Sequence, residues 1–365
     1  MKKGKVLITV TNNVVYDRRV NRIATTLAHA GYEVHCVGRL MNAKEEVHPT
    51  PGITRIKSLF RQGPWFYFWF NIQLYFFARK FGHDIHVSVD TDTLLAGIGM
   101  AFLGRKKLVY DSHEWFERTP ELLHSLIKRW IWRRLARRGA QQASLRMTVS
   151  YTLAQALEKS YGAPFQVVRN LPMYHASGPG GTFASKTIVY LGVLNAGRGL
   201  EIAIDALLEL PGYQLKLIGE GDLSAALRSQ VHARGLEDRV HLAGQVLPEQ
   251  ISGELVGASF GLLLLDPASD SYRLSLANKF FDYVQNGVPL LCSSLPEYRN
   301  LMACHPVGLL LESYTVDALV SAIKIIEQDT GRYLEMVDAC RVAATEWCWE
   351  AEAPKLLKLF EGIKE

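Results

Sequence analysis

The sequence predicts an α/β protein with two consecutive domains, each built on a mostly parallel sheet. Apolar segments rich in β-branched residues, which fit buried strands, alternate with segments of helical spacing along the chain. Glycine and proline gather between residues 170 and 186 and divide this alternation into two series. A chain of 365 residues is also long enough for two cores. We therefore expect two Rossmann-like domains that face each other across a cleft, which is the expected ligand site.

The first series opens with residues 5–10, a continuous apolar run that ends at the polar Thr11. Apolar side chains then recur at helical spacing over residues 20–28, and Gly31 is placed to end that helix. Ser150 is expected to cap a later helix. The remaining strands are expected at 33–37, 53–59, 84–89, 108–110 and 147–150, and the remaining helices at 66–81, 92–103 and from 151.

The second series leads to the most informative segment of the chain, a helix that begins at Asn278 and ends on Gly287 before a buried strand. Lys279 and Asp282 lie one turn apart at its N-terminal end, after a loop at 266–275 that follows another buried strand. Loops of this kind bind phosphorylated ligands in open α/β sheets. The other strands are expected at 187–191, 214–218, and near 240 and 260, and the other helices at 200–210 and 223–234.

Composition and charge narrow the class of protein. With 48% hydrophobic and 21% charged residues, the chain is globular rather than disordered, and a net charge of +5 gives no argument for nucleic-acid binding. The N-terminal residues lack a signal peptide's apolar region. The longest apolar run, residues 65–78, is too short to span a bilayer. The five cysteines show no C-x-x-C spacing, as is typical of buried thiols in a reducing compartment, so we expect a cytoplasmic protein.

Two glycine-rich loops of the second series suit a diphosphate. The loop after the first strand of this series contains Gly192, Arg198 and Gly199. Glycine lets the backbone approach a ligand closely, and a guanidinium beside helix amides favours an anion. The alternative is a glycine-rich turn with a surface arginine, and the residues alone leave both open. A weaker turn of the same kind, after the next strand, contains Gly219 and Gly221.

Polar residues also follow the strand at 108–110 of the first series, where His113 and Glu114 are expected to face the cleft. His113 could hydrogen-bond a sugar hydroxyl or a leaving phosphate, or it could be a satisfied structural histidine. A metal site is not expected, because the carboxylates are adjacent in sequence and no second histidine follows at helical spacing.

The loop at 11–16 is expected to point toward the same cleft and contains Asn13. Asp17 either caps the first helix or contacts a ligand. Arg18 or Arg19 could meet an anionic ligand.

In their order and spacing, these segments resemble the GT-B-fold glycosyltransferases of family 4, retaining enzymes that use nucleotide sugars. The resemblance covers nearly the whole chain. In the first series it rests on Asp-Arg-Arg-Val at 17–20, Tyr-Asp-Ser-His-Glu at 110–114 and Val-Val-Arg-Asn at 167–170. In the second series it rests on the segments at 190–192, 198–201, 217–221, 278–283 and 287–289.

The resemblance implies that Asp282 takes the place of a glutamate that holds the donor ribose. Leu274 stands where a second glutamate would contact the donor sugar, so that this contact is absent or comes from Asp266, Asp270 or Ser271.

The resemblance also implies a basic pair that holds the diphosphate. Arg198 matches one member, Val193 occupies the other position, and Lys279 could compensate. His113 matches a histidine near the sugar and the acceptor.

The implied site has three groups of residues. The catalytic residues are His113, Arg198 and Lys279. The donor-binding residues are Gly192, Arg198, Gly199, Gly219, Gly221, Asn278, Lys279 and Asp282. The acceptor-side residues are Asn13, Asp17, Arg18 and Glu114. No metal or other cofactor is expected, because the positive side chains and helix amides would stabilise the leaving diphosphate.

Two segments bear on the acceptor. The first is an aromatic run at 65–70, with more aromatics at 75–77, and the second is an arginine- and tryptophan-rich stretch at 129–138. Residues 122–157 hold seven lysines and arginines and no acidic residue. Cations interleaved with aromatics suit an anionic membrane surface, with residues 128–146 in contact. The alternative is that the aromatics pack in the core and the arginines are solvated.

From these observations we expect a first domain over 1–171, a linker over 172–186 and a second domain over 187–345. A C-terminal helix, 346–365, would cross back to the first domain, as in other GT-B proteins, and bring Trp347, Trp349 and Phe360 with it. The expected activity is a hexosyl or related transfer to a glycan or lipid-linked acceptor, at the inner face of the membrane. The rival is a non-catalytic GT-B protein that binds a nucleotide sugar or acts as a partner subunit.

Overall fold

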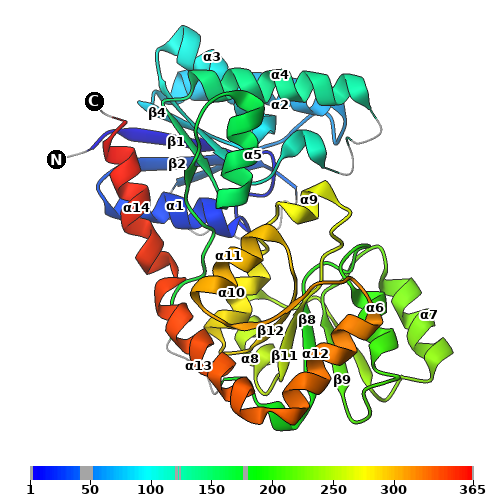
Figure 1. Ribbon diagram of the computed structural model, residues 1–365. Helices are drawn as coiled ribbons and strands as arrows, with labels where there is room; N and C mark the ends of the chain where they lie inside the picture. The colour runs from blue at the N-terminus through cyan, green and yellow to red at the C-terminus, as the bar shows by residue number, and fades with distance from the viewer. Residues whose placement is uncertain (1–2, 42–51, 120–121, 123–124, 176–179, 364–365) are drawn as a thin grey trace. The chain divides into compact units, whose positions relative to one another are not determined.

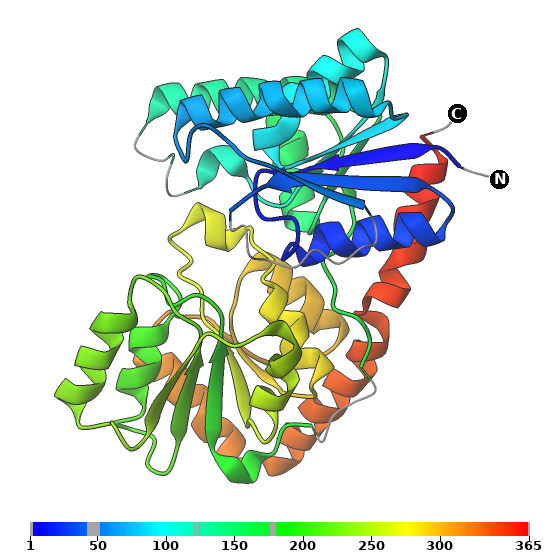
Figure 2. The same ribbon diagram turned by 180° about the vertical axis from the view of Figure 1, so that it is seen from behind.

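The structure is a computed structural model that describes residues 3–41, 52–119, 122, 125–175 and 180–363. The chain divides into two compact units (Figures 1 and 2). The first contains Met1–Asn170 together with Glu352–Glu365, and the second contains Leu171–Ala351. Part of the expected linker, residues 176–179, lies outside the described residues. Both units alternate strands and helices, and their strands pair in parallel, as the sequence predicts.

The first unit is built on a seven-stranded sheet with the order β3-β2-β1-β4-β5-β6-β7. Ile8 of β1 is in register with Cys36 of β2 on one side and Val87 of β4 on the other. The strands are β1 Lys5–Thr9, β2 Glu33–Arg39, β3 Gly52–Ile56, β4 Ile85–Val89, β5 Lys107–Ser112, β6 Leu145–Thr148 and β7 Gln166–Val167. The helices are α1 Arg18–His29, α2 Pro64–Phe81, α3 Leu94–Gly104, α4 Leu126–Gln142 and α5 Tyr151–Tyr161.

The helix boundaries of the first unit follow the capping signals in the sequence. The Asp17 side chain accepts a hydrogen bond from the Val20 amide, and Ser150 accepts one from the Leu153 amide, so both are N-caps. Gly31, with φ near 94°, ends the turn after α1. Helices α2, α3 and α4 cover one face of the sheet and α1 covers the other (Figures 1 and 2).

The second unit has a six-stranded sheet with the order β10-β9-β8-β11-β12-β13. Alternate residues of β8 face two separate hydrophobic clusters, so this sheet is buried on both faces. The strands are β8 Thr187–Leu191, β9 Gln214–Ile218, β10 Val240–Gly244, β11 Phe260–Leu263, β12 Leu290–Ser293 and β13 Gly308–Leu311. The helices are α6 Leu200–Ala206, α7 Ser224–Arg234, α8 Ile251–Leu255, α9 Asp270–Arg273, α10 Asn278–Gln285, α11 Pro296–Cys304, α12 Val316–Gln328 and α13 Thr330–Glu346.

The C-terminal region differs from the single helix expected over 346–365. Helix α13 ends at Glu346, and a separate helix, α14 Trp349–Glu361, follows. Trp347, expected to pack on the first domain, is buried in the second unit, with its ring 5.7 Å from that of Phe280. Its ring also packs against Phe281 of α10 and His305, partners that are distant in sequence and that the local sequence does not reveal. By contrast, Phe360 packs against Tyr32 of the first unit.

The cysteines of the described residues are free thiols, of which Cys304 is exposed and the other four are buried. None of the helices in the described part of the chain is long and apolar enough to cross a membrane.

Candidate functional site

The strand order of each sheet reverses at one point, between β1 and β4 in the first unit and between β8 and β11 in the second. Loops that leave the carboxyl ends of the two central strands diverge there and open a crevice, which is where α/β sheets bind ligands. Most sequence-predicted site residues lie in loops that follow these strands or their neighbour β5, or on the helix that comes next. Each unit therefore has its own polar cluster at its switch point.

In the first unit, a buried ion pair joins α1 to the end of β5. Arg19 donates from Nε and Nη2 to the two carboxylate oxygens of Asp111, at 2.9 and 2.7 Å, and from Nη1 to the Val168 carbonyl at 2.7 Å. Both side chains are almost completely buried. Burial works to raise the pKa of Asp111, but the Arg19 guanidinium and then His113 hold it well below its usual range. Asp111 is therefore a fixed negative charge inside the unit.

His113 lies between two carboxylates. Its Nε2 is 3.1 Å from Oδ2 of Asp111, its Nδ1 is 3.4 Å from Oδ2 of Asp90, and its backbone amide donates to Oδ1 of Asp90 at 2.7 Å. Burial lowers the pKa of His113, but Asp90 and Asp111 outweigh it and raise the pKa to about 9. Both ring nitrogens are directed at carboxylates, which favour the protonated ring at neutral pH.

A third carboxyl group completes this cluster. The Thr11 hydroxyl donates a hydrogen bond to Oδ2 of Asp92 at 2.5 Å. Thr11 follows β1 and Asp92 follows β4, so this contact spans the switch point. Burial, and then the nearby Asp90, raises the pKa of Asp92 to about 8. This group therefore holds a proton over much of the neutral range. Asp90 has a φ near 56°, a strained conformation for a residue other than glycine, and such strain gathers at functional sites.

Sequence reasoning missed Asp90 and Asp92. The signal was present, because both follow a buried strand just as Asp111 and His113 follow theirs. Of the two arginines that could meet an anionic ligand, Arg19 is buried and donates its hydrogen bonds to Asp111 and to the Val168 carbonyl. Arg19 lies on the buried face of α1, which the helical spacing could have shown.

The residues expected on the acceptor side are held by local contacts at the start of α1. Asp17 is the N-cap, and its other oxygen accepts a hydrogen bond from Asn12 at 2.8 Å. Asn13 accepts one from the Val15 amide at 3.3 Å. Arg18 is half-buried, and Glu114 is exposed beside His113.

In the second unit, a buried lysine lies at the switch point. Lys279, at the start of α10, is 7% exposed, and its ammonium nitrogen lies 3.6 Å from the centre of the Tyr190 ring. That nitrogen makes no hydrogen bond within the described residues. Burial, and then the neighbouring Arg198, lowers the pKa of Lys279 well below its usual value, while Asp282 opposes the shift. The site would therefore be stabilised by an anion at this position.

Arg198 is the second cation of this cluster. Its guanidinium lies 5.7 Å from the centre of the Tyr272 ring, and its buried Nε has no hydrogen-bond partner among the described residues. Tyr190, under Lys279, donates its hydroxyl to the Val193 carbonyl at 2.7 Å. Two aromatic rings thus lie close to two cations that share one region.

The glycines of these loops allow the close approach of neighbouring segments. A Cβ at Gly192 would lie 3.3 Å from the Lys279 ammonium, and a Cβ at Gly219 would lie 2.0 Å from the Gly192 carbonyl oxygen. A Cβ at Gly221 or Gly199 would likewise collide with a neighbouring loop or side chain. Their positions shape the loops around Lys279, while a direct contact with a ligand stays a prediction.

The remaining donor-side residues lie along α10 and the loop before it. Asn278 is exposed, Asp282 is half-buried one turn after it, and Leu274 is half-buried just after α9. Asp266 accepts a hydrogen bond from the Ala268 amide at 2.9 Å. The side chains of Asp270 and Ser271 lie outside the described residues.

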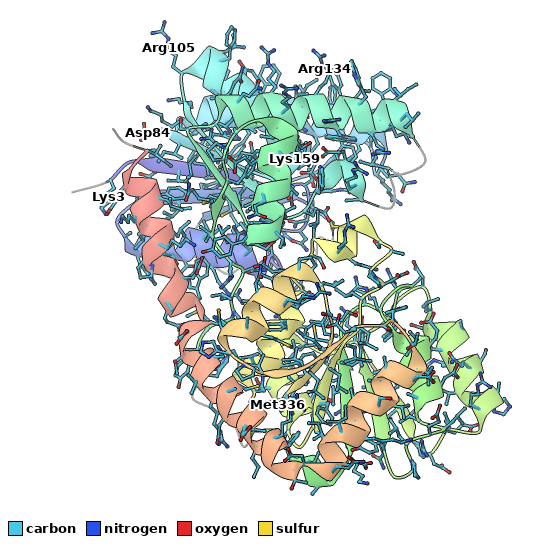
Figure 3. The ribbon with its side chains drawn as sticks, in the orientation of Figure 1. Lys3, Asp84, Arg105, Arg134, Lys159 and Met336 are labelled. Carbon is cyan, nitrogen blue, oxygen red and sulfur yellow. The ribbon has the colours of Figure 1, made fainter. Side chains whose placement is uncertain are left out.

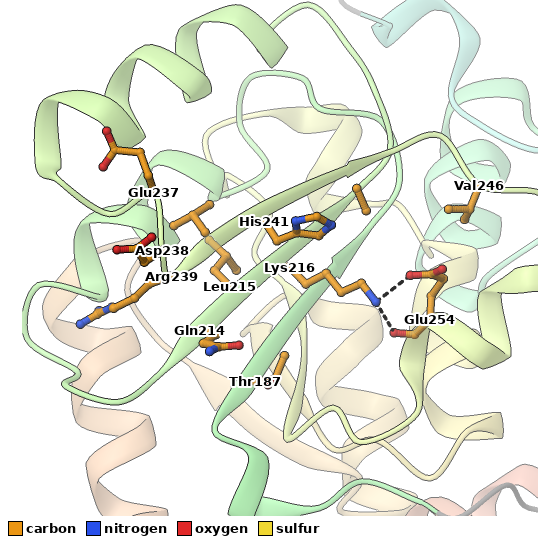
Figure 4. Close-up of a pocket in the computed structure, with 12 residues that line it drawn as sticks. Thr187, Gln214, Leu215, Lys216, Glu237, Asp238, Arg239, His241, Val246 and Glu254 are labelled. Carbon is orange, nitrogen blue, oxygen red and sulfur yellow. Dashed lines mark hydrogen bonds and ion pairs between the residues drawn. The ribbon is translucent and has the colours of Figure 1, made fainter.

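A hollow of about 250 Å³ opens beside this cluster, at the carboxyl ends of β8 and β9. It is lined by Leu191, Gly192, Val193, Ile218, Gly219, Glu220, Gln245, Val246 and Ile251. A second pocket of the unit, of about 510 Å³, lies near the first residues of β8, β9 and β10, where Lys216 pairs with Glu254 at 2.6 Å (Figure 4). Among the described residues, no three side chains that could hold a metal ion come together.

Comparisons with known proteins agree with this architecture. The family model "Glycosyltransferase Family 4" matches residues 17–171, and the model "Glycosyl transferases group 1" matches residues 185–329. The two matches cover most of the first and second units, respectively. A search of curated protein sequences gives no significant match.

Several solved structures share the whole fold at low sequence identity. A sucrose-phosphate synthase from Thermosynechococcus elongatus has a TM-score of 0.80 at 15% identity, with 99% of each chain covered. HepE from Anabaena, in complex with UDP and glucose, has a TM-score of 0.77 at 16% identity, with 98% of this chain and 99% of that chain covered. WaaG, a glycosyltransferase of lipopolysaccharide biosynthesis, has a TM-score of 0.70 at 14% identity, with 96% and 98% covered.

Proposed function

Because the chain belongs to the family 4 glycosyltransferases of the GT-B fold, we propose that it moves a sugar from a nucleoside-diphosphate donor to a glycan or lipid-linked acceptor. The transferred group is a hexose or a related sugar, and the transfer retains the configuration of the anomeric carbon. HepE is a protein of this fold with UDP and glucose bound, which supports a nucleotide sugar as the donor class.

The observation that carries the proposal is the pair of cations at the switch point of the second unit. The Lys279 ammonium is buried without a hydrogen-bond partner among the described residues and lies close enough to Arg198 for its pKa to fall. Two neighbouring cations of this kind suit a diphosphate, which carries charge on both phosphates. Their positive charge would stabilise the departing diphosphate without a metal ion.

The other residues of the second unit supply the remaining contacts of the donor. Asp282 accepts hydrogen bonds from the ribose hydroxyls of the donor. The hollow beside Gly192 has room for the planar base of the nucleotide. Gly199, Gly219, Gly221 and Asn278 shape and border the diphosphate site. These roles extend the family resemblance to particular positions of this chain.

In the first unit, His113 contributes a fixed positive charge near the sugar, since its ring nitrogens face Asp90 and Asp111. Asn13, Asp17, Arg18 and Glu114 border the acceptor side. We further propose a cytoplasmic protein that associates peripherally with an anionic membrane through residues 128–146, where a lipid-linked acceptor of glycolipid or polysaccharide assembly would be found.

Calorimetry with a nucleoside diphosphate and with the bare nucleoside tests the proposal. The Arg198→Ala substitution should weaken binding of the nucleoside diphosphate by about 1.5–3 kcal/mol, because a hydrogen bond to a charged group is lost. It should leave the affinity for the bare nucleoside unchanged. Lys324→Ala, at an exposed lysine on α12, is the matched control and should change neither. Equal losses for both ligands would show that Arg198 does not touch phosphate.

Leu274 favours a second candidate, a non-catalytic protein that binds a nucleotide sugar or acts as a partner subunit. The side chain is apolar where the family has a glutamate that contacts the donor sugar. Binding, hydrolysis and transfer, each measured with a panel of nucleotide sugars, would separate the two candidate functions. Binding without turnover of any donor would favour the non-catalytic one.

A further inference from the structure

Helix α2 is apolar on both its faces. Phe66, Phe70 and Leu74 are buried beneath it, while Trp65 is 68% exposed and Phe76 is 64% exposed on the opposite side. Phe68 and Trp69, one turn after Trp65, are exposed on that same outer side. The outer face of a helix that covers a sheet is normally polar, so an aromatic outer face indicates a partner other than water.

Helix α4 continues this apolar surface. Helix α3 packs against both α2 and α4, and side chains from the N-terminal halves of α2 and α4 meet, because the ring of Tyr67 lies 5.0 Å from that of Trp132. Trp132 therefore packs inward, but Trp130 is 60% exposed and Ile131 is exposed beside it. We call six of the exposed apolar residues of the two helices the α2/α4 surface: Trp65, Phe68, Trp69, Phe76, Trp130 and Ile131.

Cations border the α2/α4 surface on one side. Four arginines of α4 are exposed: Arg133, Arg134 (labelled in Figure 3), Arg137 and Arg138. The Arg134 guanidinium lies 5.1 Å from the centre of a ring of Trp130. Neither α2 nor α4 contains an aspartate or a glutamate. An apolar strip with a positively charged border suits the boundary between the acyl chains and the headgroups of anionic lipids.

We propose that the α2/α4 surface inserts into an anionic lipid bilayer, with its aromatic rings at the level of the headgroups and the arginines of α4 on the lipid phosphates. This inference rests on the membrane association in the proposed function and adds an apolar contribution to the binding. Residues 128–146 alone would give binding through charge, which salt abolishes. The apolar rings of α2 add a component that salt does not screen.

The charges favour a bilayer over two other occupants. A second copy would bring the same arginine border against itself in a two-fold dimer, and like charges would repel. A nucleic acid would need cations along its whole track, whereas residues 64–78 of α2 contain none.

Vesicle binding by the full chain tests the inference. The wild-type protein should bind vesicles of phosphatidylglycerol and phosphatidylcholine more tightly than vesicles of phosphatidylcholine alone, and part of the binding should survive high salt. A variant with Trp65→Ser, Phe68→Ser, Trp69→Ser and Trp130→Ser should bind only at low salt. A variant with Arg133→Gln, Arg134→Gln, Arg137→Gln and Arg138→Gln should bind anionic vesicles on the order of 1,000-fold more weakly.

Leu334→Ser with Val342→Ser removes exposed apolar side chains from α13 of the second unit and should change nothing. Tryptophan fluorescence of the wild-type protein gives a test that needs no variant, because lipids brominated near the headgroup should quench it more than lipids brominated deep in the acyl chain.

Nucleoside-diphosphate affinity, measured on the same samples, separates this inference from the proposed function. If the wild-type protein binds the nucleoside diphosphate but does not bind anionic vesicles at low salt, the membrane inference is overturned and the proposed sugar transfer is not. Self-association that the serine variant abolishes, or tighter binding to an oligonucleotide than to vesicles, would also overturn it. A wild-type protein that binds no nucleoside diphosphate would instead count against the proposed function.

Discussion

The two switch-point clusters differ in how their charges are balanced. In the first unit, Arg19 and His113 face Asp111 and Asp90, so two positive and two negative side chains balance one another inside the protein. In the second unit, Lys279 and Arg198 lie near each other over the rings of Tyr190 and Tyr272, and Asp282 is the carboxylate that acts on the Lys279 pKa.

This difference separates a cluster of matched opposite charges from one in which two cations lie near each other. The first cluster needs nothing from solution and should contribute to stability. The second holds a buried ammonium at a cost in free energy, which a bound anion would offset. Substitutions in the two clusters should therefore have opposite effects on the stability of the unliganded protein.

Arg19→Met should have the largest effect and lower the free energy of unfolding by about 3–5 kcal/mol, because the buried Asp111 carboxylate would lose its two hydrogen bonds from the guanidinium. Thermal or urea denaturation measures the loss. The double variant Arg19→Met with Asp111→Leu should recover much of it, since no isolated charge remains. A single variant as stable as the wild-type protein would contradict the view that this cluster is structural.

His113 should make stability depend on pH. Its pKa of about 9 in the folded protein lies above the ordinary value of 6.5. Its contribution is therefore fully present below pH 6.5 and is lost as the pH rises through about 9, by an amount on the order of 3 kcal/mol. The comparison of the wild-type protein with His113→Gln isolates this effect, and the two should converge in alkaline solution.

The buried His83 gives the opposite trend and serves as an internal reference. Burial lowers the pKa of His83 to about 4, so its neutral form stabilises the fold and its protonation destabilises it as the pH falls below 6.5. This acid-side loss should be the same in the wild-type protein and in His113→Gln. A difference between the two proteins that grows on the acid side alone would show that the His113 pKa is not raised.

Lys279→Met tests the contrast between the stabilising first-unit cluster and the second-unit cluster. The unliganded variant should melt at the same temperature as the wild-type protein or higher, because a buried charge has been removed, yet bind a nucleoside diphosphate more weakly by about 1.5–3 kcal/mol. Calorimetry and thermal denaturation on the same preparation measure both quantities. A large loss of stability would place Lys279 among the structural residues.

The smallest effect is expected for the substitution of Asp282 by glutamate. Asp282→Glu keeps the carboxylate on a longer stem and should change nucleotide affinity by no more than about 0.5 kcal/mol. Asp282→Asn removes the charge and should weaken binding by about 1.5–3 kcal/mol for each charged hydrogen bond lost. Equal affinities for all three proteins, by calorimetry, would mean that the ribose is held elsewhere.

The elements of the fold were predictable because their signals are local. The β-branched run of β1, the N-caps Asp17 and Ser150, and the glycine after α10 each act over a few residues. The second-unit cluster was predictable for the same reason, since Lys279 and Arg198 lie at the starts of helices that follow buried strands. Whether they bind a donor stays a prediction.

The first-unit cluster and the packing of α14 were harder to predict, because the partners are distant in sequence. Arg19 and Asp111 are 92 residues apart, and nothing local shows that they meet. The aromatic run of α2 illustrates the same limit. Its spacing gives two faces, but only the structure shows that Phe66 is buried and Trp65 is exposed.

Helix α14 also has a consequence for how the protein is made. The first unit takes Glu352–Glu365 as its last segment, and Phe360 is completely buried there against Tyr32. On the ribosome, residues 1–170 emerge long before this segment exists, so the apolar surface that receives Phe360 stays open while the second unit is synthesised. Domains usually fold from the N-terminus onward as they emerge, and exposed apolar surface of this kind invites aggregation. The first unit is thus begun first and finished last.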